Sequence, residues 1–227
     1  MDALKWLHKR VSDALPNIHQ GRLSSLFCSV SGLLNGQHLS LTGVGRHLPD
    51  DAFEKHKIKR VDRLLGNHRL HAERHQFYRW MSHELLGNVL HPNIIVDWSD
   101  IDTAKQLFLL RAAVSVGGRA LVLYEEVHGR YHHPSDTRRF LRCLAQCLPP
   151  GCKPVIVTDA GFKSPWFKAV AELGWTYVGR VRHRDYVRYP DTDEWFPAKT
   201  LYKQATRHPK TLGEIWIPRS SPMLTRA

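Results

Sequence analysis

The sequence lacks a membrane-spanning segment, a secretory leader and a cysteine framework. No apolar run approaches the roughly 18–20 residues that a transmembrane helix needs. The stretch Met1–Trp6 has neither the basic region nor the long apolar core of a signal peptide. The four cysteines, at positions 28, 143, 147 and 152, form no CxxC pair, so buried, inert thiols are a better interpretation than a zinc site. We therefore expect a cytoplasmic protein with reduced cysteines.

Acidic residues are also scarce. The chain has 21 Asp and Glu against 33 Lys and Arg, which gives a formal net charge of +12. The excess is spread along the 227 residues, so it favours a folded DNA- or RNA-binding surface over a basic tail. A generic basic protein kept soluble by its charge is the alternative. The apolar content of 42% is typical of a globular protein.

The first ninety residues have apolar side chains at helical spacing. The pattern predicts helices over residues 3–15, 21–34, 42–48, 57–65 and 72–86. Pro16, Asn35-Gly36 and Pro49 interrupt the pattern, and Gly87–Pro92 is the strongest candidate for a domain boundary. We therefore expect an all-helical domain over residues 1–90.

One helix of this domain is strongly basic on one side. In Lys57–Leu65 the apolar residues 58, 61, 64 and 65 form a stripe, and the other face carries Lys57, Lys59, Arg60 and Arg63. A helix packed by its stripe would turn these cations toward a duplex, as in helix-turn-helix proteins. A solvated basic face is the alternative.

The pattern changes after the boundary. Short apolar runs rich in β-branched residues predict strands over residues 93–98, 107–116, 119–127, 154–158 and 175–182. Gly117-Gly118 indicates a hairpin. Helices are predicted over 137–148 and 164–173, the second with Ser164 as N-cap and Pro165 at N1. The order β-β-β-α-β-α-β predicts an α/β domain with a mixed sheet over residues 91–182. Residues 183–227 are expected to form short strands that do not close a domain.

Two aspartates occupy unusual positions in these strands. Asp97 lies within the apolar run Ile94–Trp98, and Asp159 follows the run Val155–Thr158. A charge on a buried strand needs a counter-ion, and carboxyl ends of strands are where ligand sites gather in α/β sheets. If the two strands are neighbours, Mg²⁺ or Mn²⁺ would stabilise the converging carboxylates. A turn cap or an arginine partner for each aspartate is the alternative, and Asp100 and Asp102 lie close enough to be confused with ligands.

The stretches Ile94–Asp100 and Ile156–Phe162 resemble the first two acidic motifs of bacterial insertion-sequence DDE transposases, closest to those of tetracycline-resistance transposons. Further similar stretches are Ile58–Asn67, Val178–Arg182 and Lys210–Gly213. The resemblance implies an RNase H-like catalytic domain behind a helical domain that binds the terminal inverted repeats of a transposon. It implies metal-ligand and catalytic roles for Asp97 and Asp159, with Mg²⁺ or Mn²⁺ as cofactor.

The same resemblance implies a third ligand, a glutamate on a later helix, after an inserted β-rich domain. Glu172, Glu194 and Glu214 do not lie in the family's motif for that residue, which suggests a truncated copy that ends inside the inserted region. Arg180 and Arg182, in a matching stretch, are expected to contact DNA. The implied partners are double-stranded DNA at transposon ends and a second copy of the chain in a homo-oligomer. An inactive DNA-binding fragment that occupies transposon ends or inhibits full-length transposase is the alternative, and an unrelated RNase H-like nuclease is a third.

Two further expectations concern histidines and the sheet. The fifteen histidines show no metal-binding spacing, so the sets 68/71/75 and 128/132/133 are interpreted as solvated or DNA-facing. Without a covering final helix, the sheet is expected to leave Ile95, Leu109, Val122 and Ile156 partly uncovered.

Overall fold

The computed structural model describes residues 3–208 and 210–227, which divide into two compact units, Met1–Met81 and Ser82–Ala227. The three-part division expected from the sequence, with its boundary near residue 90, stays a prediction. None of the described helices is both long and apolar enough to cross a bilayer.

The first unit is built from helices. They are α1 (Ala3–Ala14), α2 (Gln20–Gly36), α3 (Leu41–Arg46), α4 (Glu54–Leu65) and α5 (His68–Leu86), of which α5 continues into the second unit. The periodicity predicted each of these helices, although α4 and α5 begin about one turn earlier than expected. The core of α1 and α2 consists of Val11, Ile18, Leu23 and Phe27.

Glycines let α2, α3 and α4 approach closely. A Cβ on Gly45 would lie 2.7 Å from the Cα of Ile58 in α4, and a Cβ on Gly32 would lie 2.7 Å from the carbonyl oxygen of Val44. Ser40 caps α3, since its Oγ accepts a hydrogen bond from the Gly43 amide at 3.0 Å. The position of α4 is therefore set by backbone contact with α3 as well as by its apolar stripe.

The second unit contains a five-stranded mixed sheet. Its strands are β1 (Asn93–Asp102), β2 (Leu107–Val116), β3 (Arg119–His128), β4 (Val155–Thr158) and β5 (Thr176–Gly179), in the order β3-β2-β1-β4-β5. The β2–β3 hairpin turns at Gly117-Gly118, where φ values of 57° and 77° favour glycine. The predicted α/β class and mixed sheet are confirmed, and this arrangement is consistent with an RNase H-like fold.

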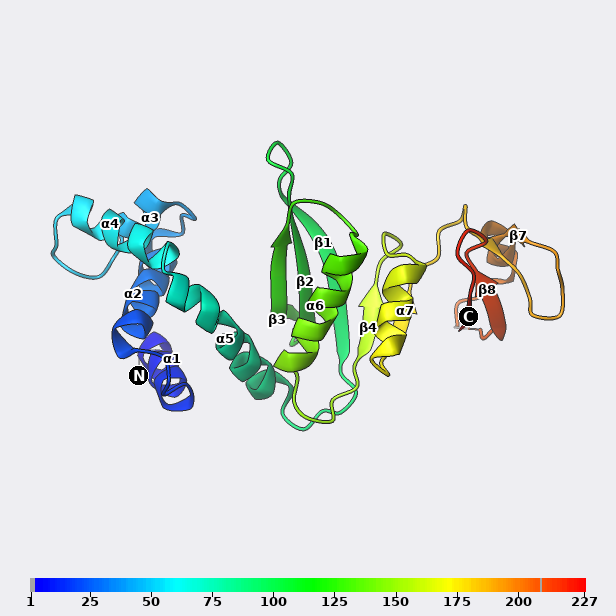
Figure 1. The fold of residues 1–227 in the computed structure, drawn as a ribbon, viewed down its shortest axis with the longest axis horizontal. Coiled ribbons are helices and arrows are strands. Elements are labelled where there is room, and N and C mark those ends of the chain that lie inside the picture. The colour runs from blue at the N-terminus through cyan, green and yellow to red at the C-terminus, as the bar shows by residue number, and fades with distance from the viewer. Residues whose placement is uncertain (1–2, 209) are drawn as a thin grey trace. The chain divides into compact units, whose positions relative to one another are not determined.

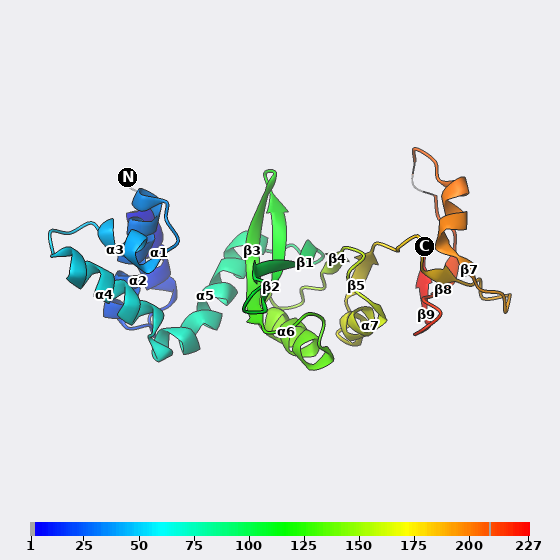
Figure 2. The same cartoon turned by 90° about the horizontal axis from the view of Figure 1, so that it is seen from above.

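Two helices cover one face of the sheet. They are α6 (Pro134–Cys147) and α7 (Ser164–Glu172), and both lie on the same side of the strands (Figures 1 and 2). Phe140 of α6 packs against Tyr124 of β3, with ring centroids 5.2 Å apart. Ser164 is the first residue of α7 rather than its expected N-cap, because its hydroxyl donates to the carbonyl oxygen of Ser221 at 2.9 Å.

The opposite face of the sheet is partly uncovered, as expected at Ile95. Ile94 and Val96 are fully buried under the helices, whereas Ile95 between them is 44% exposed. The run Ile94–Trp98 is thus an alternating strand and not the fully buried one that was expected. Ile156 was wrongly expected on the open face: it is fully buried, since it pairs in register with Ile94. Leu109 and Val122, also expected there, are half-buried.

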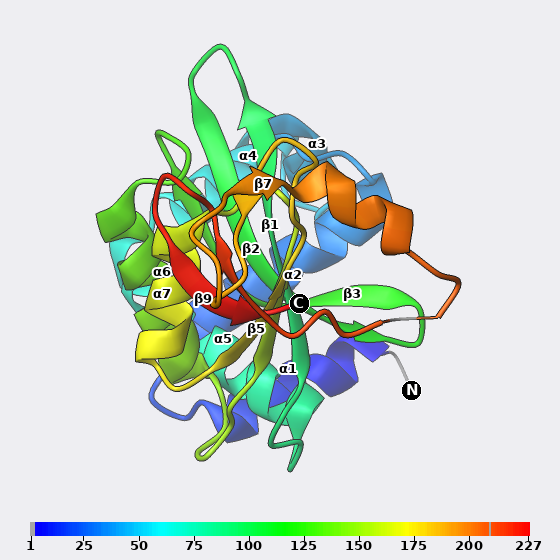
Figure 3. The same cartoon turned by 90° about the vertical axis from the view of Figure 1, so that its right-hand side faces the viewer.

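The last forty-five residues form a small β-rich layer. It contains β6 (Tyr186–Val187), β7 (Phe196–Pro197), the 3-10 helix η1 (Ala198–Gln204), β8 (Glu214–Ile217) and β9 (Met223–Arg226). Val187, Ala198 and Ile215 form its core. The hydroxyl of Tyr177 in β5 donates to the Thr225 hydroxyl at 3.2 Å, which joins this layer to the edge of the main sheet (Figure 3).

Candidate metal-binding and DNA-binding sites

The topology brings the two predicted aspartates to one edge of the sheet. β1 and β4 are parallel neighbours, and their last paired residues are Val96 and Thr158. Asp97 and Asp159 each follow directly, so they occupy equivalent steps on adjacent strands. β3 and β5 run in the same direction as this pair. Four strands therefore run toward the same edge, where ligand sites of α/β sheets form.

Burial does not explain the two carboxylates in the way that the sequence suggested. Asp97 and Asp159 are both exposed, because Asp97 lies on the face of β1 that no helix covers. The cost of a buried charge is therefore not what demands a counter-ion here. The attraction for a cation arises instead from two negative charges held on neighbouring strands at one edge.

Of the two aspartates, one has the turn-capping role that was considered as an alternative to metal binding. Asp159 does cap a turn, since its Oδ1 accepts from the Gly161 amide at 2.8 Å. Asp97 makes no hydrogen bond or ion pair within the described part of the chain. Arg111, which faces it across the β1–β2 ladder, is bound to Glu125 at 2.8 Å. The Asp97 carboxylate and the second oxygen of Asp159 are therefore available to a ligand.

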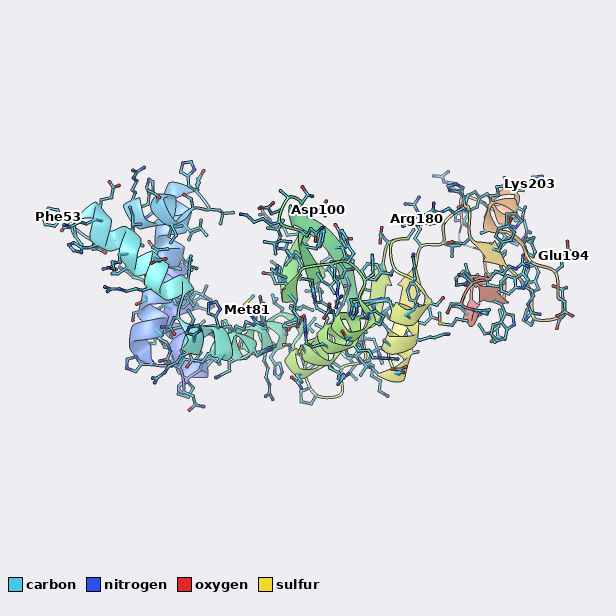
Figure 4. All side chains as sticks on the ribbon, turned by 45° about the horizontal axis from the view of Figure 1, so that its top comes forward. Phe53, Met81, Asp100, Arg180, Glu194 and Lys203 are labelled. Atoms are coloured by element: carbon cyan, nitrogen blue, oxygen red, sulfur yellow. The ribbon has the colours of Figure 1, made fainter. Side chains whose placement is uncertain are left out.

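The neighbouring aspartates are occupied. Asp100, labelled in Figure 4, accepts a hydrogen bond from the Tyr131 hydroxyl. That bond, with the nearby charge of Asp97, raises the pKa of Tyr131 to about 12. Asp102 accepts from the Lys105 amide at 3.1 Å and pairs with the Lys105 ammonium group at 3.3 Å. Neither residue is as free as Asp97 to bind a cation.

The loop between β3 and α6 adds groups that sequence reasoning missed. His132 lies near Asp159, Lys163 and Arg182, and its pKa is lowered by burial first and then by the charges of Lys163 and Arg182. Only the alignment of β3 with β1 brings this loop to the edge, so no local spacing could have revealed it. Of the set 128/132/133, which was expected to be solvated or DNA-facing, His132 is exposed, but the expectation was wrong for His128, which is buried.

A buried polar network supports this loop. Glu126 of β3 accepts from the Tyr124 hydroxyl at 2.5 Å and from Arg139 of α6 at 2.9 Å. His128 lies 3.3 Å from the same carboxylate, and burial lowers its pKa. The ring of Trp98, next to Asp97, packs edge-on against His128 at 5.2 Å. The network thus fixes the end of β3, and Trp98 of β1 contacts it across the intervening strand β2.

No third carboxylate joins the pair in the residues that the structure describes. Glu172 pairs with Arg138 at 3.1 Å, on exposed side chains of α7 and α6. Glu194 is exposed in the β-rich layer, and Glu214 is exposed at the start of β8. Across residues 3–208 and 210–227, no three His, Cys, Asp or Glu side chains are grouped as metal ligands would be.

The donors present nevertheless suit one kind of metal. Carboxylate oxygens are hard ligands, and Mg²⁺ is commonly held by only one or two of them while it keeps several waters. Asp97 and Asp159 offer that donor set at a solvent-exposed edge. The residues fit a Mg²⁺ or Mn²⁺ ion that is held weakly.

Two of the basic side chains of α4 bind other residues of the helical unit. Lys57 donates to the Leu48 carbonyl oxygen at 3.1 Å, and Arg60 pairs with Asp50 at 2.5 Å. That hydrogen bond to Asp50 raises the pKa of Arg60. These two residues hold the segment between α3 and α4, a role that the sequence did not suggest.

The remaining two predicted cations of α4, Lys59 and Arg63, are exposed, and neither is ion-paired among the described residues. Lys55 lies one turn before Lys59 and is exposed as well. Val61 and Leu64 of the expected apolar stripe are buried and Ile58 is half-buried, but Leu65 is 58% exposed. The free basic surface of α4 therefore consists of residues 55, 59 and 63.

Arg180 and Arg182, the other predicted DNA contacts, follow β5. Arg180 is exposed and is labelled in Figure 4, and its backbone amide donates to the Thr158 carbonyl oxygen at 3.3 Å. That bond places the segment directly beside the residue that precedes Asp159. Arg182 is half-buried, and its amide donates to Asp185 at 2.9 Å.

Comparison with known proteins gives one match. The family profile described as the transposase DDE domain matches residues 90–222. The matched stretch is more than half of the chain and contains both Asp97 and Asp159. No curated protein and no solved structure matches the sequence.

Proposed function

The chain belongs to the transposase DDE domain family, and on that premise we propose that it binds the inverted-repeat ends of a mobile DNA element and cuts and joins DNA there. Asp97 and Asp159 are the proposed metal ligands, with Mg²⁺ or Mn²⁺ as the cofactor. The observation that carries the proposal is the placement of these two carboxylates at equivalent steps of adjacent parallel strands. We include in this proposal the more specific resemblance to the transposases of tetracycline-resistance transposons.

The chain's own groups would position a DNA strand at this edge. Lys163 and Arg182, on the side of Asp159, supply positive charge for a phosphodiester. The Tyr131 hydroxyl donates to Asp100, and this bond raises the pKa of Tyr131 to about 12. A divalent ion bound by the two aspartates would polarise a phosphodiester oxygen and lower the pKa of an attacking hydroxyl.

DNA recognition is assigned to the helical unit. The support for this assignment is the free basic surface of α4, made of residues 55, 59 and 63. Because Lys57 and Arg60 are engaged with Leu48 and Asp50, they position α4 rather than contact phosphates. The proposed recognition helix therefore presents fewer cations than its sequence suggested.

Metal binding tests the proposal without knowledge of the DNA target. Titration of the whole chain with Mn²⁺, followed by electron paramagnetic resonance, should show one weak site with a Kd on the order of 10⁻³ M, since only two charged ligands hold it. Asp97→Asn and Asp159→Asn should each abolish that site. Glu172→Gln is the matched control, because it removes an exposed carboxylate elsewhere on the same unit. Unchanged binding in both aspartate variants would exclude the proposed site.

A second candidate function is an inactive DNA-binding protein that occupies transposon ends or inhibits a full-length transposase. It is favoured by the absence of a third carboxylate beside the pair among the described residues. Nicking of a supercoiled plasmid in Mn²⁺ separates the two functions. Nicking that Asp97→Asn abolishes supports the enzyme, and duplex binding without nicking supports the inhibitor.

A further inference from the structure

A cavity of about 540 Å³ lies between the edge of the main sheet and the C-terminal hairpin. Tyr177 of β5 and Phe167 of α7 line one side, with ring centroids 4.9 Å apart. Ile217 and Met223, from β8 and β9, line the other side. A hydrogen bond from the Tyr177 hydroxyl of β5 to the Thr225 hydroxyl of β9 links the two sides. The volume is within the range of about 300–1,000 Å³ that is usual for ligand sites.

The charge around this cavity is unbalanced. One acidic side chain, that of Asp185, lines the cavity. Five cationic side chains line it as well: Lys163, Arg180, Arg182, Arg184 and Arg226. Several other arginines of the unit are paired with carboxylates, as Arg138 is with Glu172 at 3.1 Å and Arg111 is with Glu125 at 2.8 Å. Within residues 3–208 and 210–227, none of the five makes an ion pair. Like charges gathered around one space repel each other unless an anion enters it.

The cavity adjoins the candidate metal site. Lys163 and Arg182 line the cavity and also act on His132, which in turn interacts with Asp159. Arg180 follows directly on β5, beside the last residue of β4. An anion in the cavity would thus lie next to the edge where the two carboxylates stand. A polymer with regularly spaced phosphates could occupy both places at once.

The volume of the cavity indicates whether single-stranded or double-stranded DNA could enter it. A cavity of about 540 Å³ has the size of a small-ligand site, so a double helix cannot enter it. A single strand fits, and cations combined with aromatic rings are the usual surface for single-stranded nucleic acid. We propose that this cavity binds the backbone phosphates of a single DNA strand that continues past the cleavage site. The proposal rests on the proposed function, because it assumes that DNA is the substrate at Asp97 and Asp159.

The test is binding of a short fluorescein-labelled oligothymidine strand to the whole chain, measured by anisotropy in EDTA over a series of salt concentrations. Each cation that contacts a phosphate should contribute about 0.7 to the slope of log K against log salt for a single strand. Arg182→Ala and Arg184→Ala should each lower that slope by about this amount. Arg182→Lys and Arg184→Lys should largely restore it, because they keep the charge. Arg138→Ala, which removes an exposed arginine from α6, is the control.

The result that would overturn the inference is an equal slope and affinity in Arg182→Ala, Arg184→Ala and Arg138→Ala, with circular dichroism showing all three folded. Loss of single-strand binding in the alanine variants without recovery in the lysine variants would indicate a structural role and would also overturn it. An equal loss for duplex DNA would refute the selection of a single strand. Failure of the metal site alone would leave this binding intact, because the assay contains EDTA and needs no bound metal.

Discussion

Removal of the Glu126 carboxylate should selectively destabilise the main sheet. The Glu126 side chain is 7% exposed and accepts from the buried Tyr124 hydroxyl at 2.5 Å and from Arg139 at 2.9 Å. In Glu126→Ala the buried hydroxyl loses a charged acceptor, a loss of about 1.5–3 kcal/mol. The Arg139 guanidinium adds little, since its side chain is 55% exposed and remains solvated. Tyr124 also interacts with Cys143, which keeps the expected loss near the low end, about 2 kcal/mol.

The adjacent residue of the same strand supplies the control. Glu125 pairs with Arg111 at 2.8 Å on the open face, where the two side chains are 31% and 45% exposed. Glu125→Ala should therefore cost less than about 1 kcal/mol. Glu126→Gln keeps an acceptor for the Tyr124 hydroxyl and should fall between the two alanine variants.

Hydrogen exchange read by mass spectrometry resolves the sheet from the helical unit. Peptides that cover β2 and β3 should lose about 30-fold in protection in Glu126→Ala, which corresponds to about 2 kcal/mol in the opening equilibrium. Peptides from α1 to α4 should be unchanged, because the network lies wholly in the second unit. Equal protection in Glu126→Ala and Glu125→Ala would refute the reasoning that burial, and not charge pairing alone, gives Glu126 its effect.

Three further predictions concern DNA, packing and pH. Arg63→Ala should lower the slope of log K against log salt for duplex binding by about 0.9, the value for one phosphate contact. Arg60→Ala should leave that slope unchanged, because the Arg60 side chain is paired with Asp50. Gel-shift titrations over a series of salt concentrations measure both slopes. Gly45→Ala should destabilise the helical unit by about 1–3 kcal/mol, because the added Cβ would clash with the backbone of α4. Gly129→Ala should have no such effect, since no atom lies within 4 Å of the position that its Cβ would take. Urea unfolding measures the stability of both variants. Burial lowers the pKa of His128, so the unfolded chain binds a proton at a higher pH than the folded chain does. Stability should therefore fall as pH drops below about 6.5. The urea midpoint of His128→Gln should depend less on pH between about pH 7 and pH 5. A profile as steep as that of the unmodified chain would contradict this.

The order of elements was readable from the sequence because it depends on local periodicity. Helical spacing predicted α1 to α5, and β-branched runs with Gly117-Gly118 predicted the first three strands and their hairpin. The boundaries were less accurate: β1 extends to Asp102, since pairing with β2 continues beyond the apolar run. Asp97 and Asp159 were identifiable because a charge interrupts or ends an apolar pattern, which is also a local feature.

What surrounds these residues was decided only by tertiary structure. Asp97 was expected to be buried, but α6 and α7 cover a single face of the sheet and leave its side chain in solvent. Arg60 belongs to the same basic helix as Arg63, yet only Arg60 meets Asp50 across the α3–α4 turn. The cavity combines residues in and around α7, β5 and β9 that are up to 67 positions apart, from Ala160 to Ala227. Periodicity along the chain indicates which side chains share one face of a helix or strand. The residues that pack against that face come from distant segments of the chain, and no local pattern encodes which segments those are.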